Sequence, residues 1–158
     1  MLLRPATADD LDFLAAMMLE ACNWTGETWF TLEKARADDK VWRYLADWPL
    51  PRDFGVIAEI DGVPAGAAWA RLLTAPRAGY GYVADDVPEL TLGVAPAYRR
   101  RGVARALLNT LADTARASSY QRLSLSVDPN NPAAALYKSL GYQFVEINGT
   151  SETLVLNL

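Results

Sequence analysis

The residues with the clearest chemical meaning lie at positions 89–104, which read ELTLGVAPAYRRRGVA. Leu90, Leu92 and Val94 alternate with Thr91 and Gly93, which is the pattern of a strand with one buried face. After the strand come three cations, a glycine and the start of a helical pattern: Arg99, Arg100, Arg101, Gly102, Val103 and Ala104. A helix start offers unpaired backbone N–H groups and the positive end of the helix dipole. The stretch therefore predicts a site for an anion such as a phosphate group.

The remaining inventory of reactive side chains is narrow, because the sequence has no histidine and only one cysteine, Cys22. The absence of histidine excludes every histidine-activated nucleophile, and a single cysteine excludes an internal disulfide and a multi-cysteine zinc site. Leu11, Leu14, Met18 and Cys22 recur at helical spacing, which favours a packed core thiol over a nucleophile. Proton transfer must therefore rely on carboxylates, tyrosines, backbone groups or a cofactor.

A second stretch of interest, VDPNNPAAALYKSLGYQF, occupies positions 127–144. Asn131 is a good N-cap residue, Pro132 suits the first helical position, and Gly141 can adopt the left-handed conformation that ends a helix. These signals predict one short helix that carries Tyr137.

The two stretches together resemble the acetyl-coenzyme A site of the GNAT superfamily of N-acetyltransferases. The first matches R-x-x-G-x-A after a V-x-P strand end, and the second matches N-x-x-A-x-x-L-Y followed by Gly-Tyr. The matching residues are Arg99, Gly102, Ala104, Asn130, Ala133, Leu136, Tyr137 and Gly141. The resemblance is strong from Phe54 to about Ile147 and faint before it, where acceptor specificity usually resides.

This resemblance implies a set of cofactor-binding residues: Leu92, Gly93, Val94, Arg99, Arg100, Arg101, Gly102, Val103, Ala104, Asn130, Ala133 and Tyr137. Within that set, Asn130 would contact the pantetheine arm and the N–H of Val94 would polarise the thioester oxygen. Tyr137 would protonate the departing thiolate, because a phenol matches an alkyl thiolate in basicity. The alternatives are that Arg101 is a solvated surface cation, that Asn130 is a loop residue or a cap that competes with Asn131, and that Tyr137 is one more core aromatic.

The reaction that the family uses is direct transfer of acetyl to an amine, and it needs a group that removes a proton from the acceptor. Glu89, at the start of the central strand, is predicted to be this general base, with a pKa raised by burial. The alternative is a charge that solubilises the strand end. Asp85 and Asp86 could attract a cationic acceptor or belong to a solvated loop. No metal site is predicted, because these carboxylates lack the spacing of a known metal-binding loop.

The elements that must position these residues follow from periodicity and turn signals. Thr7 and Asp10 have capping-box spacing, and Asp61-Gly62 between two apolar runs predicts a type I′ hairpin. Strands are expected at 1–4, 54–60, 63–72, 89–94, 123–127, 142–147 and 153–158, and helices at 8–22, 31–46, about 101–117 and the short segment near Tyr137.

The resemblance implies an α/β (α+β) fold with a mixed, mostly antiparallel sheet of six or seven strands flanked by about four helices. Strands 89–94 and 123–127 would form its central parallel pair, with helix 101–117 as the crossover. The two strands would diverge at their C-terminal ends to admit the pantetheine arm. Gly93 inside the first of them indicates a bulge or a close backbone approach.

Composition sets the protein class. The 158 residues suit one domain over 1–158, and 51% hydrophobic with 22% charged residues is ordinary for a globular protein. A net charge of −4 argues against a nucleic-acid partner despite the arginine run. No stretch resembles a signal peptide or 18 uninterrupted apolar residues, so a cytoplasmic protein without a membrane partner is expected.

The sequence thus predicts an acetyl-CoA-dependent N-acetyltransferase that acts on a primary amine of a small molecule or peptide. Two alternatives stay open: a non-catalytic regulatory module that binds acetyl-CoA, and a transferase that uses another acyl-CoA. A homodimer is also compatible with the sequence. The crowded aromatics Trp24, Trp29, Trp42 and Trp48 either pack helices on the sheet or form the wall of an acceptor pocket.

Overall fold

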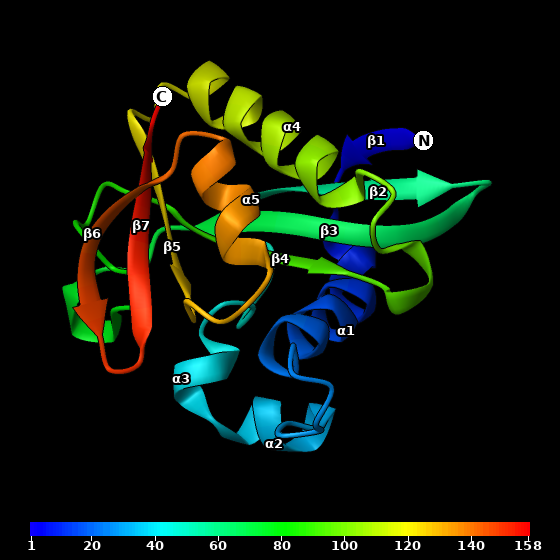
Figure 1. The fold of residues 1–158 in the computed structure, drawn as a ribbon, viewed down its shortest axis with the longest axis horizontal. Coiled ribbons are helices and arrows are strands. Elements are labelled where there is room, and N and C mark those ends of the chain that lie inside the picture. The colour runs from blue at the N-terminus through cyan, green and yellow to red at the C-terminus, as the bar shows by residue number, and fades with distance from the viewer.

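The computed structural model describes residues 1–158 and contains one seven-stranded sheet in the order β1-β2-β3-β4-β5-β7-β6 (Figure 1). The strands are β1 (Leu2–Pro5), β2 (Phe54–Ile60), β3 (Val63–Arg71), β4 (Glu89–Val94), β5 (Arg122–Val127), β6 (Gln143–Asn148) and β7 (Ser151–Asn157). The α-helices are α1 (Leu11–Cys22), α2 (Leu32–Ala37), α3 (Asp39–Trp42), α4 (Val103–Ala117) and α5 (Ala133–Ser139). All strand pairs are antiparallel except β4 with β5. The predicted fold class is confirmed.

Local sequence signals explain most element boundaries. The Thr7 hydroxyl accepts a hydrogen bond from the Asp9 N–H, and the Asp10 carboxylate accepts one from the Thr7 N–H at 2.7 Å, which completes the predicted capping box. Asp61 and Gly62 both have positive φ, at 52° and 77°, as a type I′ turn requires. Gly141, with φ of 98°, follows the short helix α5 in the predicted left-handed conformation.

The expected helix over 31–46 is instead two short helices, α2 and α3, which raises the helix number from about four to five. The break falls at Asp38, whose backbone is extended with φ −101° and ψ 105°. Its carboxylate accepts a hydrogen bond from the Lys40 N–H at 3.0 Å and so caps the second helix. A side chain that caps a helix competes with helix continuation, and here the cap prevails.

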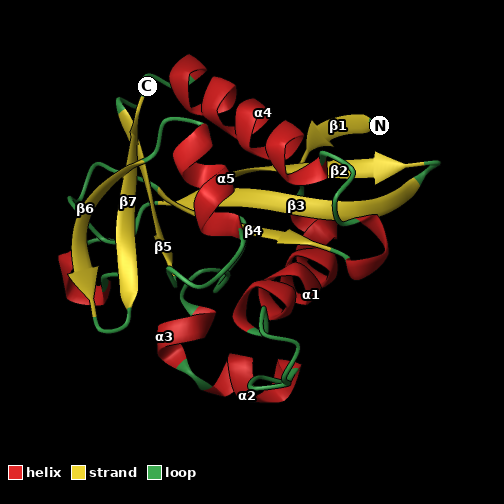
Figure 2. Cartoon of the chain, in the orientation of Figure 1, coloured by secondary structure: helices red, strands yellow, loops and turns green.

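Helices cover both faces of the sheet (Figure 2). One core lies under α4 and α5 and includes Val56, Leu90 and Leu107, and the other lies under α1, α2 and α3 and includes Leu14, Ile57 and Trp69. Neighbouring strand residues supply opposite cores because successive side chains of a strand point to opposite faces. None of the helices combines the length and the apolar character that a membrane crossing requires.

The central parallel pair is short and opens into a V. β4 and β5 are in register only at Glu89 and Ser124, where the Ser124 N–H donates to the Pro88 carbonyl at 3.0 Å. Beyond this point β5 turns away from β4, and α5 lies in front of the opening (Figure 1). The predicted divergence of the two strands at their C-terminal ends is therefore present, with α4 as the crossover between them.

Candidate functional site

A cavity of about 860 Å³ occupies the region where β4 and β5 diverge. It is bounded by both strands, the C-terminal end of α1, the loop between β4 and α4, and α5. The predicted site residues that line it are Glu89, Leu92, Gly93, Val94, Arg99, Arg100, Gly102, Val103, Ala104, Ala133 and Tyr137. The structure thus brings both predicted catalytic side chains and the start of α4 around one hollow.

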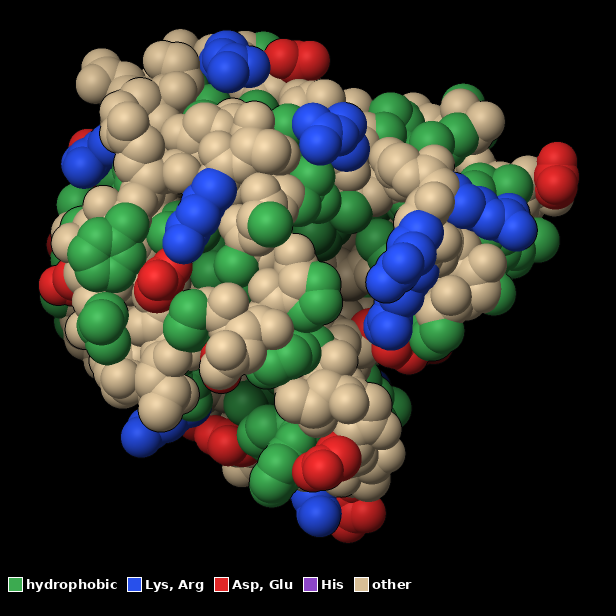
Figure 3. Space-filling model, in the orientation of Figure 1, with side chains coloured by type: hydrophobic (Ala, Val, Ile, Leu, Met, Phe, Trp, Pro, Cys, Tyr) green, Lys and Arg blue, Asp and Glu red, His purple; other side chains and the backbone are tan.

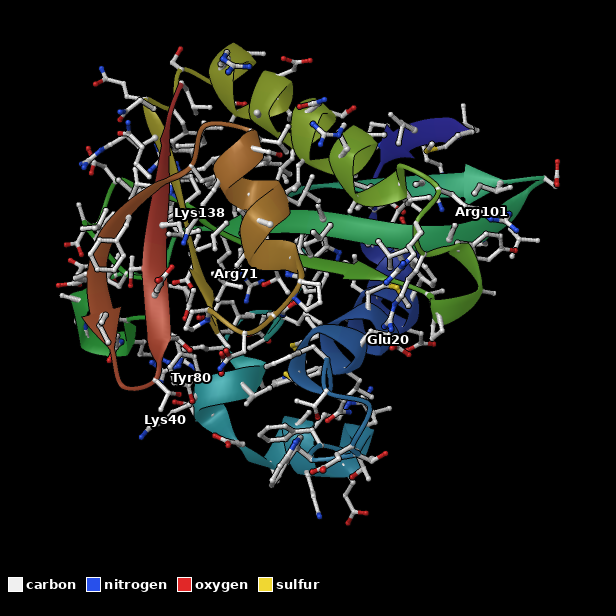
Figure 4. The ribbon with its side chains drawn as sticks, in the orientation of Figure 1. Glu20, Lys40, Arg71, Tyr80, Arg101 and Lys138 are labelled. Carbon is white, nitrogen blue, oxygen red and sulfur yellow. The ribbon has the colours of Figure 1, made fainter.

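Two predicted cofactor-binding residues, Asn130 and Arg101, lie outside the cavity. Asn130 is exposed, and its N–H donates to the Asp128 carboxylate at 2.8 Å. The neighbouring Asn131 lines the cavity instead, and its side-chain oxygen accepts the Ala133 N–H at 3.0 Å. Arg101 stacks over the Tyr98 ring at 5.6 Å and points away from the cleft between β4 and β5 (Figure 4). Its position agrees with the surface-cation alternative.

The start of α4 is open and positively charged. Gly102 stands at its N-cap with φ of 78°, and no residue beyond its chain neighbours lies within 4 Å of the place where a Cβ would be. Arg100 and Arg105 line the cavity on either side of this turn, and Figure 3 shows basic side chains around a hollow on this face. Arg99 is committed elsewhere, because it pairs with Glu20 at 2.9 Å and donates to the Val94 carbonyl at 3.2 Å. The turn therefore offers an anion both free amides and two cations.

The edge of β4 that faces the opening carries free backbone groups. The Ala95 N–H donates to the Ala65 carbonyl of β3 at 2.8 Å. Successive N–H groups of a strand point alternately to its two sides, so the N–H groups of Leu92 and Val94 point toward β5. β5 has diverged there, and its place in the ladder is vacant. Gly93 packs so close to α1 that a Cβ would lie 2.3 Å from the Met17 carbonyl oxygen. The glycine thus marks a close backbone approach.

Glu89 is a buried carboxylate at the apex of the V, with 3% of its surface exposed. Its Oε2 accepts hydrogen bonds from the Tyr44 hydroxyl at 2.5 Å and from the Gly81 N–H at 3.0 Å, whereas its Oε1 is buried without a partner. Burial raises the pKa of Glu89 to about 7, against the opposing effect of these two hydrogen bonds. A carboxylate with this pKa can gain and lose a proton near neutral pH.

Tyr137 projects from α5 into the same cavity and is also a core residue, 6% exposed. Its ring meets the Tyr142 ring edge-on, with 5.6 Å between centroids. Burial raises the pKa of Tyr137 above its usual value, so the phenol stays protonated at neutral pH. Both sequence-based interpretations of this residue therefore find support, because its ring packs in the core and its side chain borders the cavity.

Comparison with known proteins places this geometry in a family. A family model described as "Acetyltransferase (GNAT) family" matches residues 18–142, which include the whole cavity-forming part of the sheet up to β6. The chain belongs to the GNAT acetyltransferase family. The recognition made from the two sequence motifs is confirmed.

Individual relatives agree with that assignment. The N-alpha-acetyltransferase RimI of Mycobacterium tuberculosis is 47% identical over 55 residues, which are 35% of this chain and 34% of that protein. The match thus spans about a third of the curated relative. The ribosomal-protein-alanine N-acetyltransferase of Brucella melitensis has the same fold, with a TM-score of 0.72, 22% identity and full coverage of both chains. A paia N-acetyltransferase from Thermoplasma acidophilum, solved in complex with coenzyme A, also superposes over both full chains, with a TM-score of 0.68 and 14% identity.

Other residues singled out in the sequence of this GNAT protein fall in several places. Cys22 lines the cavity, but burial raises the pKa of its thiol to about 11, which disfavours a nucleophile. Asp85 accepts hydrogen bonds from the Tyr82 hydroxyl and the Ala75 N–H, and so organises its own loop. The tryptophans divide: Trp24 lines the cavity, Trp42 and Trp48 pack in the core under α1, and Trp29 is 62% exposed.

Sequence reasoning missed Tyr44 as a partner of Glu89, and it missed Asn131 and Arg105 as lining residues. It also missed the loop glycines Gly79 and Gly81, which pack on Glu89 and on the backbone of β5. The tripeptide Gly79-Tyr80-Gly81 inside a long loop was an available signal, because closely spaced glycines indicate a backbone that passes near another chain segment.

The first testable prediction concerns the anion site. We expect Gly102→Val to weaken coenzyme A binding about tenfold or more, because valine at φ of 78° costs about 1–2 kcal/mol and places a branched side chain over the amides of α4. Isothermal calorimetry with coenzyme A measures the dissociation constant. Gly62→Val is the matched control, since its φ is 77° and its Cβ site is equally open. It should lower the melting temperature similarly and leave the affinity unchanged. Equal affinities for Gly102→Val and wild type would place the phosphate site elsewhere.

A second prediction follows from the pKa of Glu89, which folding raises from 4.5 to about 7. The folded state binds this proton more tightly than the unfolded state. The contribution of protonated Glu89 to the free energy of unfolding is therefore fully present below pH 4.5 and is lost as pH rises through 7. The loss amounts to about 3 kcal/mol. Glu89→Gln resembles the protonated form of Glu89, so the variant should not lose this stability as pH rises. Urea unfolding at pH 5 and pH 8.5 measures the difference between the two proteins, which should favour the variant increasingly as pH rises. A difference that does not change with pH would contradict the raised pKa.

Proposed function

We propose that this chain is an acetyl-CoA-dependent N-acetyltransferase that acetylates a primary amine by direct attack. The observation that carries the proposal is that a carboxylate with a pKa of about 7 and a protonated tyrosine border one cavity, at whose rim the open, basic start of α4 lies. This combination supplies a proton acceptor, a proton donor and an anion site.

The residues present fit coenzyme A. The left-handed turn at Gly102 leaves the first amides of α4 uncovered for a pyrophosphate, with Arg100 and Arg105 beside them. The vacant ladder positions at Leu92 and Val94 suit the amides of an extended pantetheine arm. Asn131, the neighbour of the predicted pantetheine contact Asn130, and Ala133 also line the cavity. Acetyl-CoA, when bound, supplies the activated acyl group.

Two side chains, Glu89 and Tyr137, then transfer one proton each. Glu89 takes a proton from the acceptor amine, whose nitrogen forms the new bond to the acetyl carbon as the bond from that carbon to sulfur breaks. The N–H of Val94 donates a hydrogen bond to the carbonyl oxygen as charge develops there. Tyr137 gives its proton to the departing sulfur, so that the products are an amide and a free thiol.

The acceptor is proposed to be a primary amine of a small molecule or a peptide. The cavity wall on the α1 and β6–β7 side is contributed by Trp24, Tyr80 and Ser151, among others. The relative RimI carries the name N-alpha-acetyltransferase, which makes peptide N-termini reasonable first acceptors to test. The cytoplasmic location, the single domain and the homodimer stay predictions.

A screen of amines and peptides with acetyl-CoA, which follows the release of free thiol, tests this function. The intact pair of Glu89 and Tyr137 argues for turnover and against a module that only binds the cofactor. Tight binding of coenzyme A without thiol release from any amine would favour the regulatory module. Release from longer acyl donors but not from acetyl-CoA would favour a different acyltransferase.

A further inference from the structure

The group that holds Glu89 in place is Tyr44, which follows α3 and is 9% exposed. Its hydroxyl accepts a hydrogen bond from the Tyr80 N–H at 2.8 Å and donates one to Glu89 Oε2 at 2.5 Å. A phenol has a single proton. Because the oxygen of Tyr44 is occupied by a backbone donor, that proton is directed at the carboxylate.

The two oxygens of Glu89 are consequently not equivalent. Oε2 accepts two hydrogen bonds, from Tyr44 and from the Gly81 N–H, which fills its acceptor capacity within the plane of the carboxylate. Oε1 is buried and has no partner in the chain. Gly79 packs against it so closely that a Cβ would lie 2.2 Å from Oε1 and 2.6 Å from the Tyr44 hydroxyl. A buried oxygen without a partner is costly unless a ligand group pairs with it.

We propose that Tyr44 is a positioning residue, which fixes Glu89 through Oε2 for the transfer of the acceptor proton to this carboxylate. The inference rests on the proposed function, since it assigns a task within that proton transfer. Tyr44 also lines the cavity, but its single proton is donated to Glu89. It acts through the carboxylate by orienting it and by favouring its ionised form.

No charged group near Glu89 orients its carboxylate or shifts its pKa as Tyr44 does. Arg71 on β3 is the register partner of Glu89, but its guanidinium pairs with Asp53 at 2.6 Å and donates to the carbonyls of Arg43 and Ala46. On the β5 side the register partner is Ser124, which is uncharged. The loop contributes Tyr80 and the N–H of Gly81, and α1 contributes no ionisable group that shifts the pKa of Glu89. Burial raises this pKa, and Tyr44 is the largest opposing influence.

The test is Tyr44→Phe, which keeps the ring and removes the hydroxyl. The acid limb of the kcat/KM profile should move to higher pH by about one to two units, since a hydrogen bond to a charged group is worth that much. Turnover at pH 9 should stay within about threefold of wild type, and KM for acetyl-CoA should not change. Tyr82→Phe is the matched control, because it also removes a hydroxyl bound to a carboxylate, Asp85 at 2.7 Å, outside the cavity. Its pH profile should equal that of wild type.

A direct titration makes the result independent of turnover. In protein labelled with ¹³C at glutamate carboxyls, the Glu89 signal is the one that Glu89→Gln lacks, and its pKa should rise in Tyr44→Phe by the same one to two units. In a double-mutant cycle, Tyr44→Phe should have no further effect on the rate once Glu89→Gln is present. An unshifted Glu89 titration, or equal losses from Tyr44→Phe in both backgrounds, would overturn the positioning role. A wild-type protein that acetylates no amine would instead refute the proposed function, and the titration would still read the effect of Tyr44 on Glu89.

Discussion

Glu89→Gln is expected to lower kcat/KM for the acceptor amine by about 1,000-fold at pH 8, within the range that general-base catalysis contributes. Glutamine is nearly isosteric, so its carbonyl oxygen can replace Oε2 and accept the hydrogen bonds of Tyr44 and Gly81. The amide nitrogen then stands where Oε1 was, and it cannot take a proton. Affinity for coenzyme A should change little, because the anion site at α4 is untouched.

The pH dependence separates loss of the base from general damage. Wild-type kcat/KM should rise with pH through about 7 and level off, because the base must be ionised, whereas the Glu89→Gln profile should lack this step. Glu59→Gln is the matched control, since Glu59 is a strand glutamate paired with Arg4 outside the cavity. It should retain wild-type turnover. If Glu89→Gln retained a third or more of the wild-type rate at pH 8, the acceptor proton would leave by another route.

The sequence predicted best those parts of the fold that depend on residues close to one another in the chain. The hairpin at Asp61-Gly62, the capping box at Thr7 and the stop at Gly141 each depend on residues within four positions of one another. The strand of β4 was predicted with its observed bounds because its alternation is clear. The prediction of one helix over 31–46 was wrong because Asp38 caps a second helix and so interrupts the helical pattern. Hydrophobic periodicity alone does not show whether such a cap or a continuous helix is favoured.

The motifs did not indicate which side chains point into the cavity. A motif assigned the cofactor contact to Asn130, but its own backbone turn with Asp128 carries that residue outward and presents Asn131 to the cavity. Three consecutive arginines looked equivalent in sequence. The positive φ of Arg100 and of Gly102 turns the chain between them, so that Arg100 borders the cavity and Arg101 stacks on Tyr98. Such turns are read from the backbone path and leave little trace in residue type.

Contacts between distant segments were beyond local patterns altogether. Tyr44 and Glu89 are 45 positions apart, and the buried pair of Arg71 and Asp53 joins the end of β3 to the loop before β2. In the sequence each member of such a pair is only an isolated charged or aromatic residue, with nothing to indicate its partner. Its meaning depends on the sheet order, which places β3 beside β4 and leaves β5 to diverge. The raised pKa of Glu89 could be anticipated as a need of the chemistry, whereas its cause, burial under the loop of Gly79 and Gly81, required the fold.

Tyr137→Phe is expected to lower kcat about 100-fold while the fold and the affinity for coenzyme A are preserved. The substitution keeps the ring that packs edge-on against Tyr142 and removes only the hydroxyl. Loss of the proton donor leaves the sulfur to depart as a thiolate or to take its proton from solvent, so the loss should fall on kcat. Steady-state kinetics with the best amine from the screen, together with calorimetry, measure both quantities.

Tyr142→Phe provides the matched control, since Tyr142 shares the same aromatic contact but does not line the cavity. Its hydroxyl is buried without a hydrogen-bond partner, so removal should leave kcat unchanged and should stabilise the fold by about 1 kcal/mol. The two variants therefore separate packing from proton donation within one pair of rings. If Tyr137→Phe turned over like wild type and Tyr142→Phe, the ring of Tyr137 would serve the core alone, and solvent would protonate the departing sulfur.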